Sequence, residues 1–147
     1  MAPNAIPVSG DQAYPGQRLG LPAEGRGSIA SWQQRITALA VDWAASMVVA
    51  VGFFGIGVVN GAGGWRAWMV MAVFFVESTV LCTLAGGSFG QLVTRIAVVR
   101  LDVAPLGLLR AAARAALVCV VIPAVVIGPD RRGLHDVAVG TAVIRRR

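Results

Sequence analysis

The feature that most constrains this chain is an apolar run over residues 36–59 in which Asp42 is the only ionisable side chain. A helix rises about 1.5 Å per residue, so the run is long enough to cross a hydrocarbon core of about 30 Å. We predict a membrane-spanning helix that begins near residues 31–34, with Ser28 or Ser31 as its N-cap.

A carboxylate inside such a helix costs about 2.5–3.5 kcal/mol at the centre, less near an end, and a residue of this kind is functional by default. Arg35 lies seven residues before Asp42, which places both on one helix face, about 10 Å apart along the axis. We expect Arg35 to offset part of the cost by snorkelling, with Thr37 or a water as a bridge. The alternative is an anchoring arginine and a carboxylate solvated inside a helix bundle.

A second apolar run, residues 67–85, contains a single charge, Glu77. A glycine-rich turn at residues 60–64 precedes it, and the tryptophans after that turn are typical of a membrane interface. We predict a second spanning helix, antiparallel to the first. Glu77 and Asp42 each lie about nine residues from the same-side end of their helices, so we expect them at one depth. The alternative is a protonated Glu77 that faces a neighbouring subunit.

Two β-branched stretches lie in the second half of the chain. Residues 95–102 and 140–145 are predicted to pair outside the membrane as a two-stranded ribbon. A ribbon of this size is marginal alone and needs the support of a helix. The fold class that follows is an all-α membrane protein with one small ribbon.

Between these strands the sequence predicts an amphipathic interfacial helix over residues 106–116, with Arg110 and Arg114 on one face. The apolar segment that follows it, residues 115–128, is only fourteen residues long and is broken near Pro123. That length fits either a re-entrant segment or a short span.

The distribution of arginine favours re-entry. All thirteen basic residues are arginine. A re-entrant third segment places twelve of them on one side of the membrane and Arg66 alone on the other, whereas three full spans split them seven to six. The positive-inside rule therefore predicts that both termini are cytoplasmic. With 56% hydrophobic and 14% charged residues, the chain fits one membrane domain, and its arginines fit contacts to anionic lipid better than to nucleic acid.

Several features predict little chemistry. Residues 1–28 hold four of the seven prolines and five glycines, so we expect a disordered tail before a membrane domain at residues 29–147. Residues 86–91 lack the end of a phosphate-binding loop and are interpreted as backbone turns alone. Cys82 and Cys119 fit small apolar positions. The sequence shows no nucleophile–base pair, metal set or cofactor loop, so we expect neither an enzyme nor a cofactor.

Three stretches together resemble the RDD family of bacterial membrane proteins, named for one Arg and two Asp. They are the first predicted helix, the glycine-rich residues 87–90 with the strand after them, and residues 131–141. The resemblance aligns the family's Arg with Arg35 and its Asp residues with Asp42 and Asp136. It implies a multi-pass plasma-membrane protein, with transport suspected and cation/proton exchange proposed for some members. Gln91 stands where a Lys commonly follows the glycines.

Asp136 is expected to lie close to Arg35, because the arginine count places both on the cytoplasmic side and a carboxylate beside apolar residues favours a guanidinium partner. The alternatives are pairing with Arg131 or Arg132, or a local helix cap. A metal or proton-relay pair with His135 is disfavoured, since adjacent helical residues point in different directions.

Two functional hypotheses follow. One is a small oligomeric transporter in which Asp42, with Glu77, binds a cation or proton while Arg35 and Asp136 tune it. Two or three helices enclose little, so such a pathway requires several subunits. The other is a non-transporting accessory or assembly protein in which Arg35, Asp42 and Asp136 form a structural cluster, with another membrane protein as partner.

Overall fold

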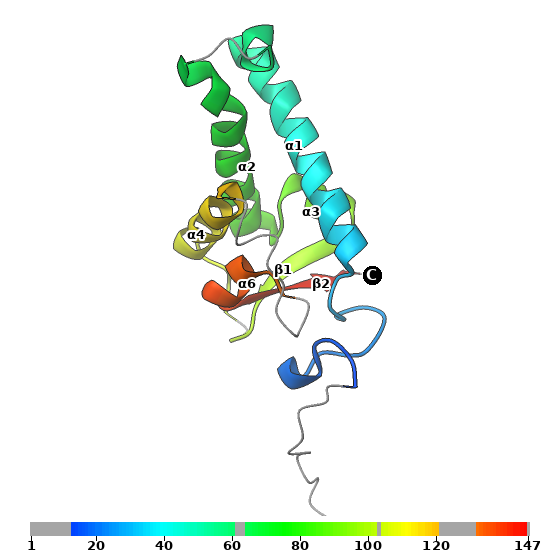
Figure 1. Ribbon diagram of the computed structural model, residues 1–147. Helices are drawn as coiled ribbons and strands as arrows, with labels where there is room; N and C mark the ends of the chain where they lie inside the picture. The colour runs from blue at the N-terminus through cyan, green and yellow to red at the C-terminus, as the bar shows by residue number, and fades with distance from the viewer. Residues whose placement is uncertain (1–12, 61–63, 103, 121–131, 147) are drawn as a thin grey trace, which may run out of the picture.

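Two long helices dominate the computed structural model, which describes residues 13–60, 64–102, 104–120 and 132–146. Helix α1, Trp32–Phe54, and helix α2, Met69–Ala85, pack side by side as an antiparallel hairpin (Figure 1). Both are long and apolar enough to cross a membrane, α2 together with the short helix η3, Gly64–Trp68. Only 22% and 24% of their apolar windows are buried, which leaves most of their surface for lipid and is unlike a soluble core helix.

Local sequence signals set the ends of the hairpin. Ser31 caps α1: its hydroxyl accepts from the Gln34 amide at 3.3 Å, and the Gln34 side chain accepts from the Ser31 amide at 3.1 Å. This reciprocal capping box fixes the predicted helix start. The helix ends at Phe54, before the predicted end of the apolar run, and a 3-10 turn η2, Ile56–Val58, follows. At the other end, Gly86 closes α2 with a φ of 69°, a left-handed cap that glycine adopts without strain.

The predicted ribbon is confirmed. Strand β1, Ile96–Arg100, pairs antiparallel with β2, Thr141–Arg145, with Val98 opposite Val143. The segment before α1 joins the edge of β2, because Ala30 donates its amide to the Val143 carbonyl at 2.9 Å. Side chains of the sheet, α1, α2 and α4 form one buried apolar cluster, which supplies the helical support that the ribbon needs. It comprises Ala30, Ala38, Cys82, Ile96, Val98, Leu106, Ala111 and Val143.

The described part of the chain contains three further α-helices. Helix α3, Phe89–Val93, lies against α1; α4, Leu108–Cys119, packs across α2; and α6, Leu134–Ala138, lies beside β2. The sheet and α6 lie at the end of the hairpin where α1 begins and α2 ends (Figure 1). Helix α4 overlaps the amphipathic helix predicted over residues 106–116, but it begins two residues later and ends three residues later.

Two expectations are left open by the described residues. The predicted break near Pro123, and with it the choice between re-entry and a span, falls in residues 121–131, outside the described part. Residues 1–12 of the expected disordered tail also lie outside it. Within residues 13–28, a 3-10 turn η1 spans Gln17–Leu19, and Gly27 donates its amide to the Arg145 carbonyl at 2.9 Å. The segment just before α1 is thereby attached to the sheet.

Candidate functional site

A fully buried carboxylate near the C-terminus contacts arginines from two other helices. Asp136, on α6, is 0% exposed. Its Oδ2 lies 3.1 Å from Nη1 of Arg35 on α1, and its Oδ1 lies 2.9 Å from Nε of Arg114 on α4. The Thr141 hydroxyl donates to Oδ1 at 3.2 Å. The expected proximity of Arg35 and Asp136 is therefore confirmed, and Arg114 is an additional partner.

Arg132 and His135, which are close to Asp136 in the sequence, differ in how they contact it. Arg132 donates to the backbone carbonyls of Thr141, at 3.0 Å, and of Asp136, at 3.2 Å, so it holds the backbone of α6 rather than the carboxylate. Arg131 lies outside the described residues. His135 Nε2 lies 3.5 Å from Asp136 Oδ1, so the expectation that these adjacent side chains diverge is wrong. Gly133 permits the approach, since a Cβ there would lie 2.4 Å from the His135 ring.

This arrangement keeps Asp136 ionised. Burial alone would raise the pKa of Asp136, but the charges of Arg114, His135 and Arg35 outweigh it and hold the pKa below the ordinary 3.8. Burial also works to lower the pKa of Arg114, and the facing Asp136 carboxylate raises it overall. The cluster of Asp136 with its two arginines is thus a paired, permanently charged group at neutral pH.

Asp42 has a different environment. It is 3% exposed on α1, and its carboxylate accepts from the Ser88 hydroxyl at 2.6 Å and from the Gly90 amide at 2.5 Å. Among the residues that the structure describes, no basic side chain lies within ion-pair distance of Asp42. The two donors to Asp42, the Ser88 hydroxyl and the Gly90 amide, are both neutral.

The expected compensation of Asp42 by Arg35 is therefore corrected. The Arg35 side chain extends toward the sheet, where it also donates to the carbonyls of Ala30 and Val143, both at 3.4 Å. The two residues share a helix face, but the nearby Asp136 is within direct reach and Asp42 is not.

The glycine-rich segment at residues 86–91 leads into α3 and contributes its first residues, so its interpretation as backbone turns alone is wrong. A Cβ on Gly90 would lie 1.9 Å from the Ala38 carbonyl oxygen, so only glycine allows α3 to lie directly on α1. Gln91 accepts from the Ser88 amide at 3.0 Å and completes the cap of α3. The first amides of this helix, which have no partner within it, remain available to acceptors outside.

Both membrane carboxylates use those amides. Glu77 Oε1 accepts from the Phe89 amide at 2.9 Å, beside the Gly90 amide that binds Asp42. Because the two donors are adjacent in the chain, Asp42 and Glu77 lie at one level of the hairpin, as the depth argument predicts.

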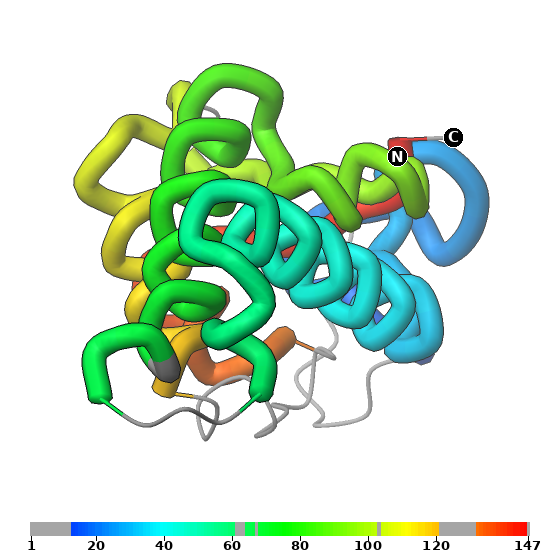
Figure 2. Tube along the Cα trace, turned by 90° about the horizontal axis from the view of Figure 1, so that it is seen from above, coloured from blue at the N-terminus to red at the C-terminus, as the bar shows by residue number. Residues whose placement is uncertain are grey.

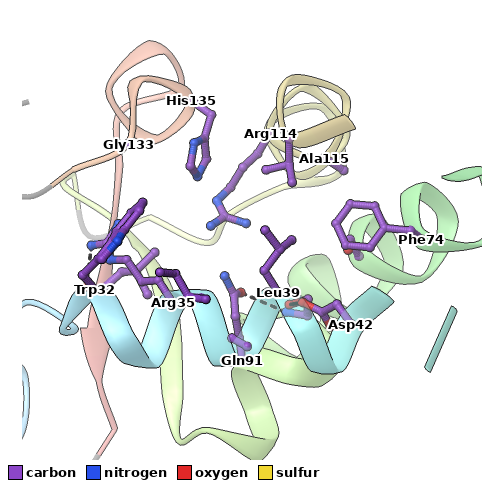
Figure 3. A pocket seen from close by; sticks show the side chains of 16 residues that line it. Trp32, Arg35, Leu39, Asp42, Phe74, Gln91, Arg114, Ala115, Gly133 and His135 are labelled. Atoms are coloured by element: carbon purple, nitrogen blue, oxygen red, sulfur yellow. Dashed lines mark hydrogen bonds between the residues drawn. The ribbon is translucent and has the colours of Figure 1, made fainter. Parts of the chain in front are cut away.

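A pocket of about 80 Å³ extends from Asp42 to Arg35 and Arg114, the two arginines that contact Asp136. Figure 3 shows Trp32, Arg35 and His135 toward one end and Asp42 and Phe74 toward the other, with Arg114 extending from α4 between them. Ser78 and Ser88 also line it. Its volume has room for a few waters or a small ion, and is well below the roughly 300–1,000 Å³ of pockets for drug-sized ligands.

Both long helices carry buried side-chain oxygens that lack a hydrogen-bond partner. Within the described part of the chain, four buried side-chain oxygens lack a hydrogen bond, namely Ser46 Oγ, Glu77 Oε2, Ser78 Oγ and Thr79 Oγ1. Such atoms are rare in folded proteins and call for a partner such as water or an ion. The same described residues contain no group of three or more His, Cys, Asp or Glu side chains arranged to hold a metal ion.

Comparison with known proteins decides the family. A model of the RDD family matches residues 29–140, most of the chain and all three of Arg35, Asp42 and Asp136. The chain belongs to the RDD family. No curated protein and no solved structure matches it. With its two candidate spans, this RDD chain is a membrane protein.

Three site residues of this RDD protein lie outside the sequence-predicted set. The sequence places Arg114 on an interfacial helix face, although an arginine inside an apolar stretch signals a buried acidic partner. Ser88 and Gly90 carry a weaker signal, a serine three residues before a glutamine, which is a capping box and hence a helix start. A helix start offers amides to carboxylates, and the two intramembrane carboxylates need donors.

Proposed function

We propose that this RDD protein is a small oligomeric transporter of the plasma membrane in which Asp42 exchanges a proton for a cation. The observation that carries the proposal is the contrast between the two RDD carboxylates. Asp136 contacts two arginines, whereas Asp42 is held by the neutral donors of Ser88 and Gly90. A buried carboxylate without a paired cation favours neutralisation, by either a proton or a cation.

The pocket supports access to this carboxylate. It runs from the Arg35 and Arg114 end to Asp42, and the Ser78 hydroxyl that lines it is buried without a hydrogen-bond partner among the described residues. Glu77, bound to the adjacent amide, is a second carboxylate for the same ion. Two spans enclose too little for a complete pathway, so the proposal includes several subunits.

We place both termini in the cytoplasm. The described part of each chain end lies on the same sheet, since Ile29 and Ile144 form a bridge. The chain leaves β1 at Arg100 and returns to β2 at Thr141 on that sheet, which supports an even number of crossings between them. The twelve-to-one distribution of arginine then favours the cytoplasm for this end.

Ion flux in proteoliposomes tests the proposal. A cation gradient is imposed across liposomes that contain the wild-type chain, and an enclosed pH dye reports proton movement. We expect gradient-driven proton flux that falls to the empty-liposome level in Asp42→Asn and is reduced in Glu77→Gln. Asp102→Asn, which removes a carboxylate 53% exposed outside the spans, is the matched control and retains full flux. Unchanged flux in folded Asp42→Asn contradicts the assignment of Asp42.

A second candidate is a non-transporting accessory or assembly protein. It is favoured by the Asp136 cluster, in which one carboxylate ties α1, α4 and α6 together as a structural lock. A folded wild-type chain without flux for any cation tested supports this candidate over the transporter.

A further inference from the structure

A groove rich in arginine lies at the sheet end of the molecule, separate from the pocket at Asp42. It has a volume of about 590 Å³, and no acidic residue is among the described residues that line it, which are Arg26, Gly27, Leu92, Arg95, Ile144, Arg145 and Arg146. We propose that this groove binds the phosphate headgroup of an anionic membrane lipid. The site is independent of transport at Asp42.

Backbone hydrogen bonds bring three distant segments together to form the groove. Gly27 donates its amide to the Arg145 carbonyl, and Arg146 donates its amide to the Arg95 carbonyl, both at 2.9 Å. Figure 2 shows the end of β2 beside the N-terminal segment and α3. Four arginines from three segments thereby line one space.

Two of these arginines are anchored and two remain available. Arg145 Nε donates to the Gln34 side chain at 3.2 Å, and the Arg146 side chain donates to the Ala85 carbonyl. Arg26 and Arg95 are exposed, and neither forms an ion pair with a described residue. A guanidinium presents paired donors that match two phosphate oxygens, so the available pair suits a phosphate group.

The backbone of Arg95 adds an independent observation. Its φ is 58°, and among the described residues it is the one non-glycine residue with a positive φ. This left-handed conformation is unfavourable for a side chain with a Cβ and concentrates at ligand-binding positions. Glycine would adopt it without strain, so the arginine side chain at this position indicates a role that offsets the strain.

The position of the groove favours lipid over a soluble anion. Its anchors attach to Gln34 in the first turn of α1 and to Ala85 at the end of α2, the level at which both candidate spans leave the membrane. Leu92 lines it, and Phe89 and Val93 of the same short helix are 44% and 56% exposed. Apolar side chains beside a cationic groove fit the boundary between headgroups and acyl chains.

Lipid titrations of the full chain in non-ionic detergent test the site, with the unfolding temperature as readout. The ligands are short-chain phosphatidylglycerol, phosphatidylcholine with the same chains, and inorganic phosphate. We expect a saturable rise with phosphatidylglycerol that the other two do not reproduce at equal concentration. The double variant Arg26→Gln/Arg95→Gln binds at least about tenfold more weakly, from the attraction typical of an arginine at an anionic surface.

The control separates a site from general attraction. The control variant Arg18→Gln/Arg66→Gln removes the same charge outside the groove and is expected to bind phosphatidylglycerol like the wild type. The single variant Arg26→Gln changes one exposed side chain and is expected to lose less affinity than the double variant, so it tests the site if the double variant does not fold. Equal weakening in the control overturns the proposal. The proposal is also overturned if inorganic phosphate raises the unfolding temperature as much as phosphatidylglycerol does, because the groove then binds a soluble anion. A wild-type chain whose unfolding temperature does not respond to phosphatidylglycerol overturns it as well.

Discussion

Gly90 is the residue on which the geometry around Asp42 depends. We predict that Gly90→Ala destabilises the chain by about 1–3 kcal/mol or more, as overpacking of a close contact does, because the added Cβ meets the Ala38 carbonyl oxygen at 1.9 Å. Gly52→Ala is the matched control: a methyl group added at that position on α1 has no atom within 4 Å, and alanine favours a helix. Unfolding temperatures in detergent compare the two, and equal stability for both contradicts the contact.

Asp136 gives a pH dependence whose sign follows from its partners. Asp136→Asn leaves Arg35 and Arg114 without their buried counter-ion, so we expect a loss of about 3–5 kcal/mol at neutral pH. The folded-state pKa of Asp136 lies below the ordinary 3.8. Its contribution is therefore complete above that value and is lost as the pH falls through the lower, folded-state pKa. Stability of wild type and variant measured from neutral to acidic pH should converge only below 3.8; a constant difference contradicts the ion pair.

The sequence predicts part of this site. The meeting of Arg35 and Asp136 follows from charge and topology, because both are placed on one side of the membrane. The donors to Asp42 do not follow, since Ser88 and Gly90 act through the start of a five-residue helix that no periodicity reveals. Nor does Arg114, whose burial depends on how α4 packs against α2 and α6.

Helices α1, α4 and α6 meet at the Asp136 carboxylate, and this contact decides which residues are energetically coupled. A double-mutant cycle should give a coupling energy for Arg35 and Asp136 of about 0.5–3 kcal/mol, as for residues in contact. The sequence alone predicts coupling between Arg35 and Asp42. The ion pair at 3.1 Å instead predicts that the Arg35–Asp42 cycle gives the smaller value. Both cycles are measured by thermal unfolding in detergent, and a larger Arg35–Asp42 coupling contradicts the assignment of partners.

The elements themselves are predictable to different degrees. Apolar length reveals α1 and α2, and β-branched residues reveal β1 and β2, because each pattern is continuous over the whole element. The end of α1 at Phe54 is harder to predict from the sequence, because the apolar run continues past it into η2. For the helices and the strands alike, residue composition indicates which segments are buried in lipid or protein. The positions at which the helices end depend instead on local backbone geometry.

The sheet ties the segment before α1 to β2, so we predict that both chain ends face the same side of the membrane. Single cysteines at Arg18 and Arg146, in a background without Cys82 and Cys119, should be modified by an impermeant reagent only after the cell membrane is opened. A cysteine at Asn60, between the spans, should react in intact cells. Modification of position 146 but not position 18 from outside contradicts the cytoplasmic assignment and restores three spans.

We propose Asp42 as the exchangeable carboxylate and Asp136 as the permanently paired one, and infrared difference spectroscopy distinguishes the two. Spectra of the reconstituted chain are recorded before and after a cation is added. We expect the loss of a protonated carboxyl band in the wild type. The same loss is expected in Asp102→Asn, and no such band is expected in Asp42→Asn. A cation-sensitive carboxyl band that persists in folded Asp42→Asn contradicts the assignment of Asp42.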